Sequence, residues 1–114
     1  MSSIRQNKVA ALIQRELGKY FLVHAKSKYM GAMVSVTVVR ISPDLAQARV
    51  YLSIFGGAGT KEEVFAVIEN SNKEIRSNFA QATKSQLRAT PNFMFFLDDS
   101  IEYASEIDRL LKKK

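Results

Sequence analysis

The chain has 114 residues, enough to bury a hydrophobic core without disulfides or metal ions, and we expect one domain over residues 1–114. It has no cysteine, which excludes disulfide scaffolds and thiolate catalysis, and its first residues lack the apolar core of a signal peptide. No run of about 18 apolar residues occurs, so the expected location is the cytoplasm, without membrane contact, and the net charge of +6 favours polyanionic partners.

The first predicted element is a helix that begins after Ser3, a suitable N-cap, and reaches about Tyr20. Apolar residues recur along one arc of this helix: Val9, Ile13, Leu17, Tyr20 and Phe21. A neighbouring arc carries four cations: Arg5, Lys8, Arg15 and Lys19. These cations form either a solvated face or part of a binding surface. The only histidine, His24, falls in a predicted loop, and we expect it to be neither a metal ligand nor a general base.

Two predicted strands follow, joined by a turn. Val34–Val39 alternates apolar with small polar residues, and Ala48–Ile54 alternates apolar with polar or aromatic residues. Ser42–Leu45 carries proline at its second position, where a fixed φ suits a turn. This pattern predicts an antiparallel hairpin in a sheet that is covered on one side only.

A glycine-rich segment, Phe55–Lys61, leaves a strand and enters a helix, as a phosphate-binding loop does. Its lysine neither follows a glycine directly nor precedes serine or threonine, so the Walker pattern is not met. Gly56–Gly59 also spells the Gly-x-x-Gly of RNA-binding KH domains, but in that fold the motif joins two helices. We interpret the segment as a flexible loop.

The longest predicted helix runs from a capping box at Thr60–Glu63 to Arg88, and Pro91 is expected to end it. At roughly 28 residues it exceeds the usual length of an uninterrupted globular helix. The small residues Ala80-Gln81-Ala82 therefore predict a kink between Ser77 and Thr83. A continuous curved helix is the alternative, because no glycine or proline marks a break.

The face of this helix opposite its apolar row is polar and carries three cations. It consists of Lys73, Ser77, Gln81, Lys84 and Arg88. These residues, together with Arg76 and the four cations of the first helix, are the predicted RNA contacts. Two helices with segregated cations favour a binding surface more strongly than either helix would alone.

A third strand, Phe93–Leu97, is short, apolar and aromatic, as buried strands are. A last helix, Ile101–Leu111, follows the acids Asp98 and Asp99. These carboxylates suggest either a metal or acid–base site or a helix cap, and capping is the simpler account. Because no nucleophile–base pair or metal cluster accompanies them, we expect no catalytic residue, metal or cofactor.

The predicted order is helix, strand, strand, kinked helix, strand, helix. A right-handed crossover places the third strand parallel to the second. The expected fold is an α+β two-layer domain, with a three-stranded mixed sheet and helices on one face. This order is the one found in type II KH domains.

The sequence also resembles the ribosome-binding factor A family over nearly its whole length. The resemblance is carried, in order, by Ile13 to Leu17, Val36-Thr37-Val38, Ser42 to Ser53, Ile75-Arg76, Leu87-Arg88, Pro91 and Phe95 to Ser100. That family is similar to KH domains but has an interhelical kink at Ala-x-Gly in place of Gly-x-x-Gly. Ala80-Gln81-Ala82 occupies the matching place here, without the glycine.

The resemblance implies a non-enzymatic RNA-binding factor for the small (30S) ribosomal subunit and its precursors. It further implies a role in processing the 5′ end of 16S rRNA, chiefly in the cold, by a monomer without a small-molecule substrate. One alternative is a generic basic module that binds DNA or RNA. Another is a small enzyme that uses Asp98 and Asp99.

Overall fold

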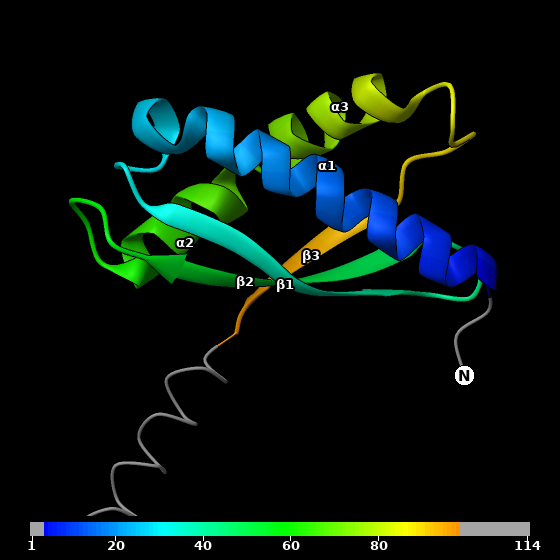
Figure 1. The fold of residues 1–114 in the computed structure, drawn as a ribbon, viewed down its shortest axis with the longest axis horizontal. Helices are drawn as coiled ribbons and strands as arrows, with labels where there is room; N and C mark the ends of the chain where they lie inside the picture. Colours follow the sequence, from blue (N-terminus) through cyan, green and yellow to red (C-terminus); the bar gives the residue numbers. More distant parts are fainter. Residues whose placement is uncertain (1–3, 99–114) are drawn as a thin grey trace, which may run out of the picture.

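The computed structural model describes residues 4–98, whose path is drawn in Figure 1. The elements follow the chain as α1 (Ile4–Lys28), β1 (Met33–Ile41), β2 (Gln47–Phe55), α2 (Lys61–Asn70), α3 (Asn72–Thr83) and β3 (Asn92–Leu97). The predicted last helix, Ile101–Leu111, and the second acid, Asp99, lie outside the described residues.

One three-stranded sheet, in the order β1-β2-β3, forms one layer of the domain. β1 pairs antiparallel with β2, whereas β2 and β3 are parallel because two helices carry the chain back between them. The helices α1, α2 and α3 lie together on one face of the sheet (Figure 1). The predicted two-layer α+β fold with a mixed sheet is therefore confirmed.

Alternation along the strands decides which side chains enter the core. The inward residues of β2 are all buried: Ala48, Val50, Leu52 and Ile54. In β1 a bulge between Val36 and Val38 shifts the alternation by one residue. The inward rows meet the predicted apolar arc of α1, all of whose members are buried. The core thus lies between the sheet and the helices.

α1 is longer than expected, because it continues through His24 to Lys28 and does not end near Tyr20. No glycine or proline interrupts the chain between Tyr20 and Lys28, so nothing local stops the helix there. It ends where Met30 and Gly31 adopt positive φ angles of 56° and 77°, and the N–H of Gly31 donates to the carbonyl of Ala25. The prediction of a loop at His24 is wrong.

The long helix breaks at Ser71, and the predicted kink at Ala80-Gln81-Ala82 is wrong. α3 is helical without interruption through those residues, while Ser71 separates it from α2. Ser71 has φ −95° and ψ 7°, and its side chain lies near the buried hydroxyl of Tyr29. That hydroxyl lies 2.9 Å from the hydroxyl of Tyr20, so the break is held by contacts with α1 and the loop after it.

α3 also ends at Thr83 and not at Arg88. The hydroxyl of Thr83 donates to the carbonyl of Phe79 at 2.8 Å, and two N–H groups that follow it converge on the Thr83 carbonyl. Residues 84–91, which we name the α3–β3 connection, therefore leave the helix well before Pro91. Lys84 and Arg88 lie on this connection, so their predicted places on a helical face are wrong.

Replacing Tyr29 with phenylalanine is expected to lower the free energy of unfolding at neutral pH by about 1–3 kcal/mol, because the buried hydroxyl of Tyr20 loses its partner. Burial raises the pKa of Tyr20 and of Tyr29 above the ordinary 10.0. Their contribution to stability is therefore complete below pH 10 and is lost as pH rises through the folded pKa values.

Urea unfolding at neutral pH and above about pH 10 measures both effects. The Tyr29→Phe variant should lose less stability at alkaline pH than the unmodified chain, because one buried hydroxyl fewer can ionise. Tyr51→Phe is the matched control, since Tyr51 is only half-buried and lies on the far side of the sheet. Equal losses for the two variants at neutral pH would show that the buried hydroxyl pair does not stabilise the fold.

Candidate nucleic-acid interface

Charge is distributed unevenly over the three helices. α1 carries six basic residues and one acid, Glu16, whereas α2 carries one lysine and three glutamates. The α3–β3 connection adds Lys84 and Arg88 without an acid. Positive charge therefore concentrates on α1 and on the connection, while α2 is acidic. A polyanion would be attracted to α1 and to the α3–β3 connection and repelled by α2.

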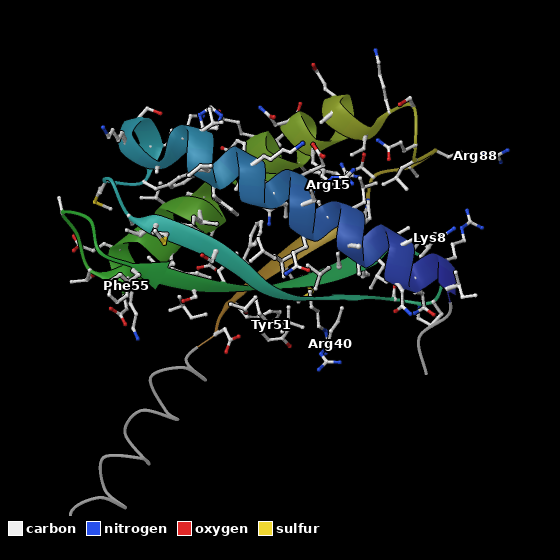
Figure 2. The ribbon with its side chains drawn as sticks, in the orientation of Figure 1. Lys8, Arg15, Arg40, Tyr51, Phe55 and Arg88 are labelled. Carbon is white, nitrogen blue, oxygen red and sulfur yellow. The ribbon has the colours of Figure 1, made fainter. Side chains whose placement is uncertain are left out.

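Every predicted RNA contact is solvent-exposed. Figure 2 shows Lys8 and Arg15 on α1 and Arg88 on the α3–β3 connection, all on the helical side of the sheet. Arg5 and Arg88 line one pocket, although they lie far apart in the sequence. We name the first turns of α1 together with the α3–β3 connection the basic end, defined by Arg5, Lys8, Lys84 and Arg88.

The pocket at the basic end also contains a carboxylate, that of Asp44. The Ser42 hydroxyl and then the Ala46 N–H donate to this carboxylate and hold the pKa of Asp44 below its usual range. Asp44 therefore stays ionised at neutral pH and is already occupied in closing the β1–β2 turn. It limits the positive potential of the pocket to the side formed by Arg5 and Arg88.

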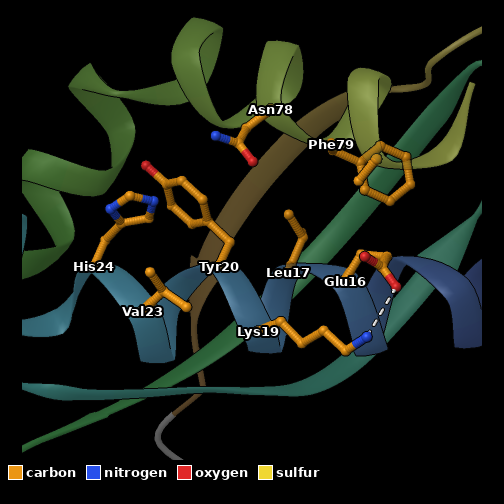
Figure 3. A pocket seen from close by; sticks show the side chains of 9 residues that line it. Glu16, Leu17, Lys19, Tyr20, Val23, His24, Asn78 and Phe79 are labelled. Atoms are coloured by element: carbon orange, nitrogen blue, oxygen red, sulfur yellow. Dashed lines mark ion pairs between the residues drawn. The ribbon is translucent and has the colours of Figure 1, made fainter.

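A second hollow lies between α1 and α3, and Figure 3 shows its lining. Lys19 comes from α1 and Asn78 from α3, with the ring of His24 4.5 Å from that of Tyr20. The Glu16 carboxylate lies 3.7 Å from the Lys19 ammonium and 3.2 Å from the Arg15 guanidinium. These two cations are thus partly neutralised, unlike those of the basic end.

The α3 residues Lys73, Ser77 and Gln81 line a third, shallow groove. The structure therefore brings these three predicted residues together, although Lys84 and Arg88 do not join them. Glu74 faces the same groove and forms an ion pair with Lys28 of α1. The groove offers amide and hydroxyl groups as well as charge.

Arg76 has a structural partner that the sequence does not reveal. Its guanidinium donates to the carbonyls of Thr90 at 2.7 Å and Pro91 at 3.1 Å. These bonds tie the α3–β3 connection to α3 and so help to hold Arg88 near α1. We therefore assign Arg76 to positioning the connection, and its predicted contact with RNA stays a prediction, as do those of the other nine residues.

Four cations within residues 4–98, apart from Lys61 of the acidic helix α2, were not among the predicted contacts. Lys26 extends the basic side of α1, whereas Lys28 faces α3 and pairs with Glu74, and the premature end placed on that helix hid both. Arg40 and Arg49 pair across β1 and β2 and point away from the helices. Strand alternation alone could have shown this for Arg49, whereas Arg40 faces outward only because the bulge between Val36 and Val38 shifts the alternation of β1. The helical surface is therefore longer than predicted, and the sheet carries charge of its own.

Within residues 4–98 no group of three or more His, Cys, Asp or Glu side chains is placed to hold a metal ion. Asp98, the one member of the acidic pair in this range, accepts a hydrogen bond of 2.5 Å from the Thr37 hydroxyl. None of the helices over the same residues has the length and apolar character needed to cross a membrane.

Sequence comparison finds the same family along almost the entire chain. The profile of the family described as Ribosome-binding factor A matches residues 5–111. Ribosome-binding factor A of Cytophaga hutchinsonii is 38% identical over 113 residues, covering 99% of this chain and 84% of that protein. The protein of the same name from Chlorobaculum tepidum is 38% identical over 110 residues, covering 96% and 90%.

Structural comparison gives a consistent fold. The crystal structure of ribosome-binding factor A from Thermus thermophilus matches with a TM-score of 0.64 at 16% identity, over 81% of this chain and 94% of that one. A homology model of the Thermus thermophilus factor, fitted into a cryo-EM map of a 30S–RbfA complex, matches with a TM-score of 0.62 at 17% identity, over 79% and 91%. At these identities the likeness establishes the fold.

Proposed function

The chain belongs to the ribosome-binding factor A family, and on this premise we propose that it is a non-enzymatic RNA-binding factor for the small (30S) ribosomal subunit. The observation that carries the proposal is the basic surface on α1 and the α3–β3 connection, set on a fold shared with that family. The 30S–RbfA complex of Thermus thermophilus supports the small subunit as the partner.

The physical basis of binding is contact between cations and backbone phosphates. Exposed lysines and arginines on a rigid helix release counterions from RNA, which makes the affinity depend strongly on salt and little on sequence. Structured RNA is then selected by shape, because the two basic segments must fit its backbone together. The acidic α2 repels phosphates and so restricts how the RNA can lie.

The finer role follows from how RNA behaves at low temperature. RNA helices become more stable and exchange more slowly in the cold, so misfolded precursors of the small subunit persist for longer. A factor that binds these precursors through shape and phosphates supports maturation of 16S rRNA at its 5′ end and matters most when cells are chilled. It acts as a cytoplasmic monomer, without a cofactor or a small-molecule substrate.

The cellular prediction concerns a strain that lacks this protein. Such a strain should accumulate 16S rRNA unprocessed at the 5′ end and grow slowly in the cold, because its precursors refold too slowly unaided. Gradient sedimentation of wild-type extract should place the protein with free small subunits and their precursors. Re-expression of the unmodified chain in the deletion strain is the control for processing and growth.

Two results would contradict this proposal. One is sedimentation of the protein mainly with polysomes, since a factor held on mature particles would obstruct translation. The other is normal rRNA processing in the chilled deletion strain. Equal affinity for duplex DNA and for structured 16S rRNA at matched salt would favour a generic nucleic-acid-binding module instead.

A further inference from the structure

Among the described residues, no helix or loop covers the face of the sheet opposite the helices. This face is not part of the basic surface on α1 and the α3–β3 connection. Figure 2 shows Tyr51, Arg40 and Phe55 on this side, away from α1 and α3. Strand pairing aligns two rows across it, Val38–Tyr51–Phe96 and Arg40–Arg49–Met94. We name these six residues the outer sheet face.

The first row contains a flat aromatic surface. The rings of Tyr51 and Phe96 are stacked, with centroids 5.2 Å apart and an angle of 25° between their planes. Both side chains are half-buried, so one part of each ring contacts its neighbours and another part meets solvent. Beside them Val38 is 37% exposed and Met94 is 48% exposed. Such a surface can accept the flat face of a nucleobase.

The second row places two positive charges beside the rings. Arg40 and Arg49 lie directly opposite each other on neighbouring antiparallel strands. Like charges in this position destabilise the strand pair. Both are exposed, and neither has a hydrogen-bond or ion-pair partner among residues 4–98. The three strands contain no Asp or Glu, and Asp98, the acid that follows β3, already accepts a hydrogen bond from the Thr37 hydroxyl. The opposed arginines are thus a local cost to the fold that an anionic ligand would relieve.

We propose that the outer sheet face binds an unpaired segment of RNA, with bases stacked on Tyr51 and Phe96 and phosphates held by Arg40 and Arg49. The rings favour RNA over a protein partner, because they lie beside a charge pair that only an anionic ligand offsets. They favour unpaired over duplex RNA, because a base must leave its helical stack to lie on a side chain.

The spacing of the two rows suits neighbouring nucleotides. Arg49 and Tyr51 lie two residues apart on β2, which separates their positions by about 6.6 Å along the strand. A single strand crossing β1, β2 and β3 could therefore place a base on the rings and a phosphate beside the arginines. This inference rests on the proposed function, since it gives the factor a second contact with RNA on the side away from its basic end.

The test measures binding of a fluorescently labelled, unstructured oligouridine of about ten nucleotides by anisotropy. Replacing both rings, Tyr51→Leu with Phe96→Leu, should lower affinity roughly tenfold or more, because bases lose their stacking partners. Arg40→Gln with Arg49→Gln should flatten the slope of log affinity against log salt by roughly 1.4. Phe65→Leu on α2 is the matched control, because it removes a ring far from this face.

Crosslinking with a 4-thiouridine oligonucleotide should label the strands that carry Tyr51 and Phe96, and thermal unfolding checks that each variant is folded. Unchanged affinity in a folded Tyr51→Leu, Phe96→Leu variant would overturn the inference. If the unmodified chain self-associates and this variant does not, while its oligouridine binding is intact, the inference is overturned too. The outer sheet face would then be the contact with a second copy of the chain. If the proposed function itself were wrong, the unmodified chain would not bind the small subunit, whatever the result with oligouridine.

Discussion

Reversing three charges at the basic end, Arg5→Glu, Lys8→Glu and Arg88→Glu, is expected to lower affinity for the small subunit by roughly a hundredfold or more. All three side chains are exposed, and none has an ion-pair partner within residues 4–98. Each loses a charge-assisted contact with a phosphate, at about 1 kcal/mol or more per contact, and each glutamate adds repulsion. The slope of log affinity against log salt should flatten by roughly 2.

Filter binding of purified small subunits over a range of salt concentrations measures both quantities. The control separates a local contact from an effect of net charge: Glu62→Lys and Glu69→Lys on α2 return positive charge to the triple variant without rebuilding the basic end. We expect this addition to restore little affinity. A triple variant that keeps the affinity and salt slope of the unmodified chain would show that these cations are merely solvated.

Replacing Phe21 with alanine is expected to lower the free energy of unfolding by about 3–5 kcal/mol. The Phe21 side chain is 0% exposed, and its ring meets those of Tyr29 and Phe95 edge to face at 5.6 and 6.5 Å. It therefore joins α1 to the loop after it and to β3. Because domains of this size have a total stability of about 5–15 kcal/mol, the cavity would remove a large part of it.

Urea unfolding measures this loss, and the neighbouring residue supplies the control. Leu22 is 79% exposed on the same helix, so Leu22→Ala should change stability by less than about 0.5 kcal/mol. A loss for Phe21→Ala as small as that for Leu22→Ala would mean that the contact between α1 and β3 does not depend on this ring. In that case the Phe21→Ala variant should stay folded and still bind the small subunit.

Periodicity alone was sufficient to locate the strands and the buried side of α1. Every second residue from Ala48 to Ile54 is buried, as the alternation predicts, because a strand that is covered on one face must place its apolar side chains on that face. The same periodicity identified four of the six basic residues of α1. These features depend on residues close together in the chain, so a local pattern contains the information needed to predict them.

The candidate site was predicted as a set of residues but not as an arrangement. Lys73, Ser77 and Gln81 share one groove because they repeat at helical spacing on α3. Arg88 lies instead beside Arg5, at the opposite end of the sequence. The bonds from Arg76 to Thr90 and Pro91 draw the α3–β3 connection to this place, and no spacing rule predicts a guanidinium bound to distant carbonyls.

The sequence by itself determined the fold class, the apolar rows and the sign of the surface charge, because each depends on local periodicity or on composition. Only the tertiary structure decided where the long helix breaks. Neither Ala80-Gln81-Ala82 nor the stretch around Ser71 contains a glycine or proline. Ser71 and the asparagines beside it are weaker helix formers than alanine and glutamine, which favours a break there, but helices tolerate such residues, so propensity alone does not fix the break. Ser71 lies near the Tyr29 hydroxyl, which α1 and the following loop bring there from a distant part of the chain, and no local pattern predicts that neighbour.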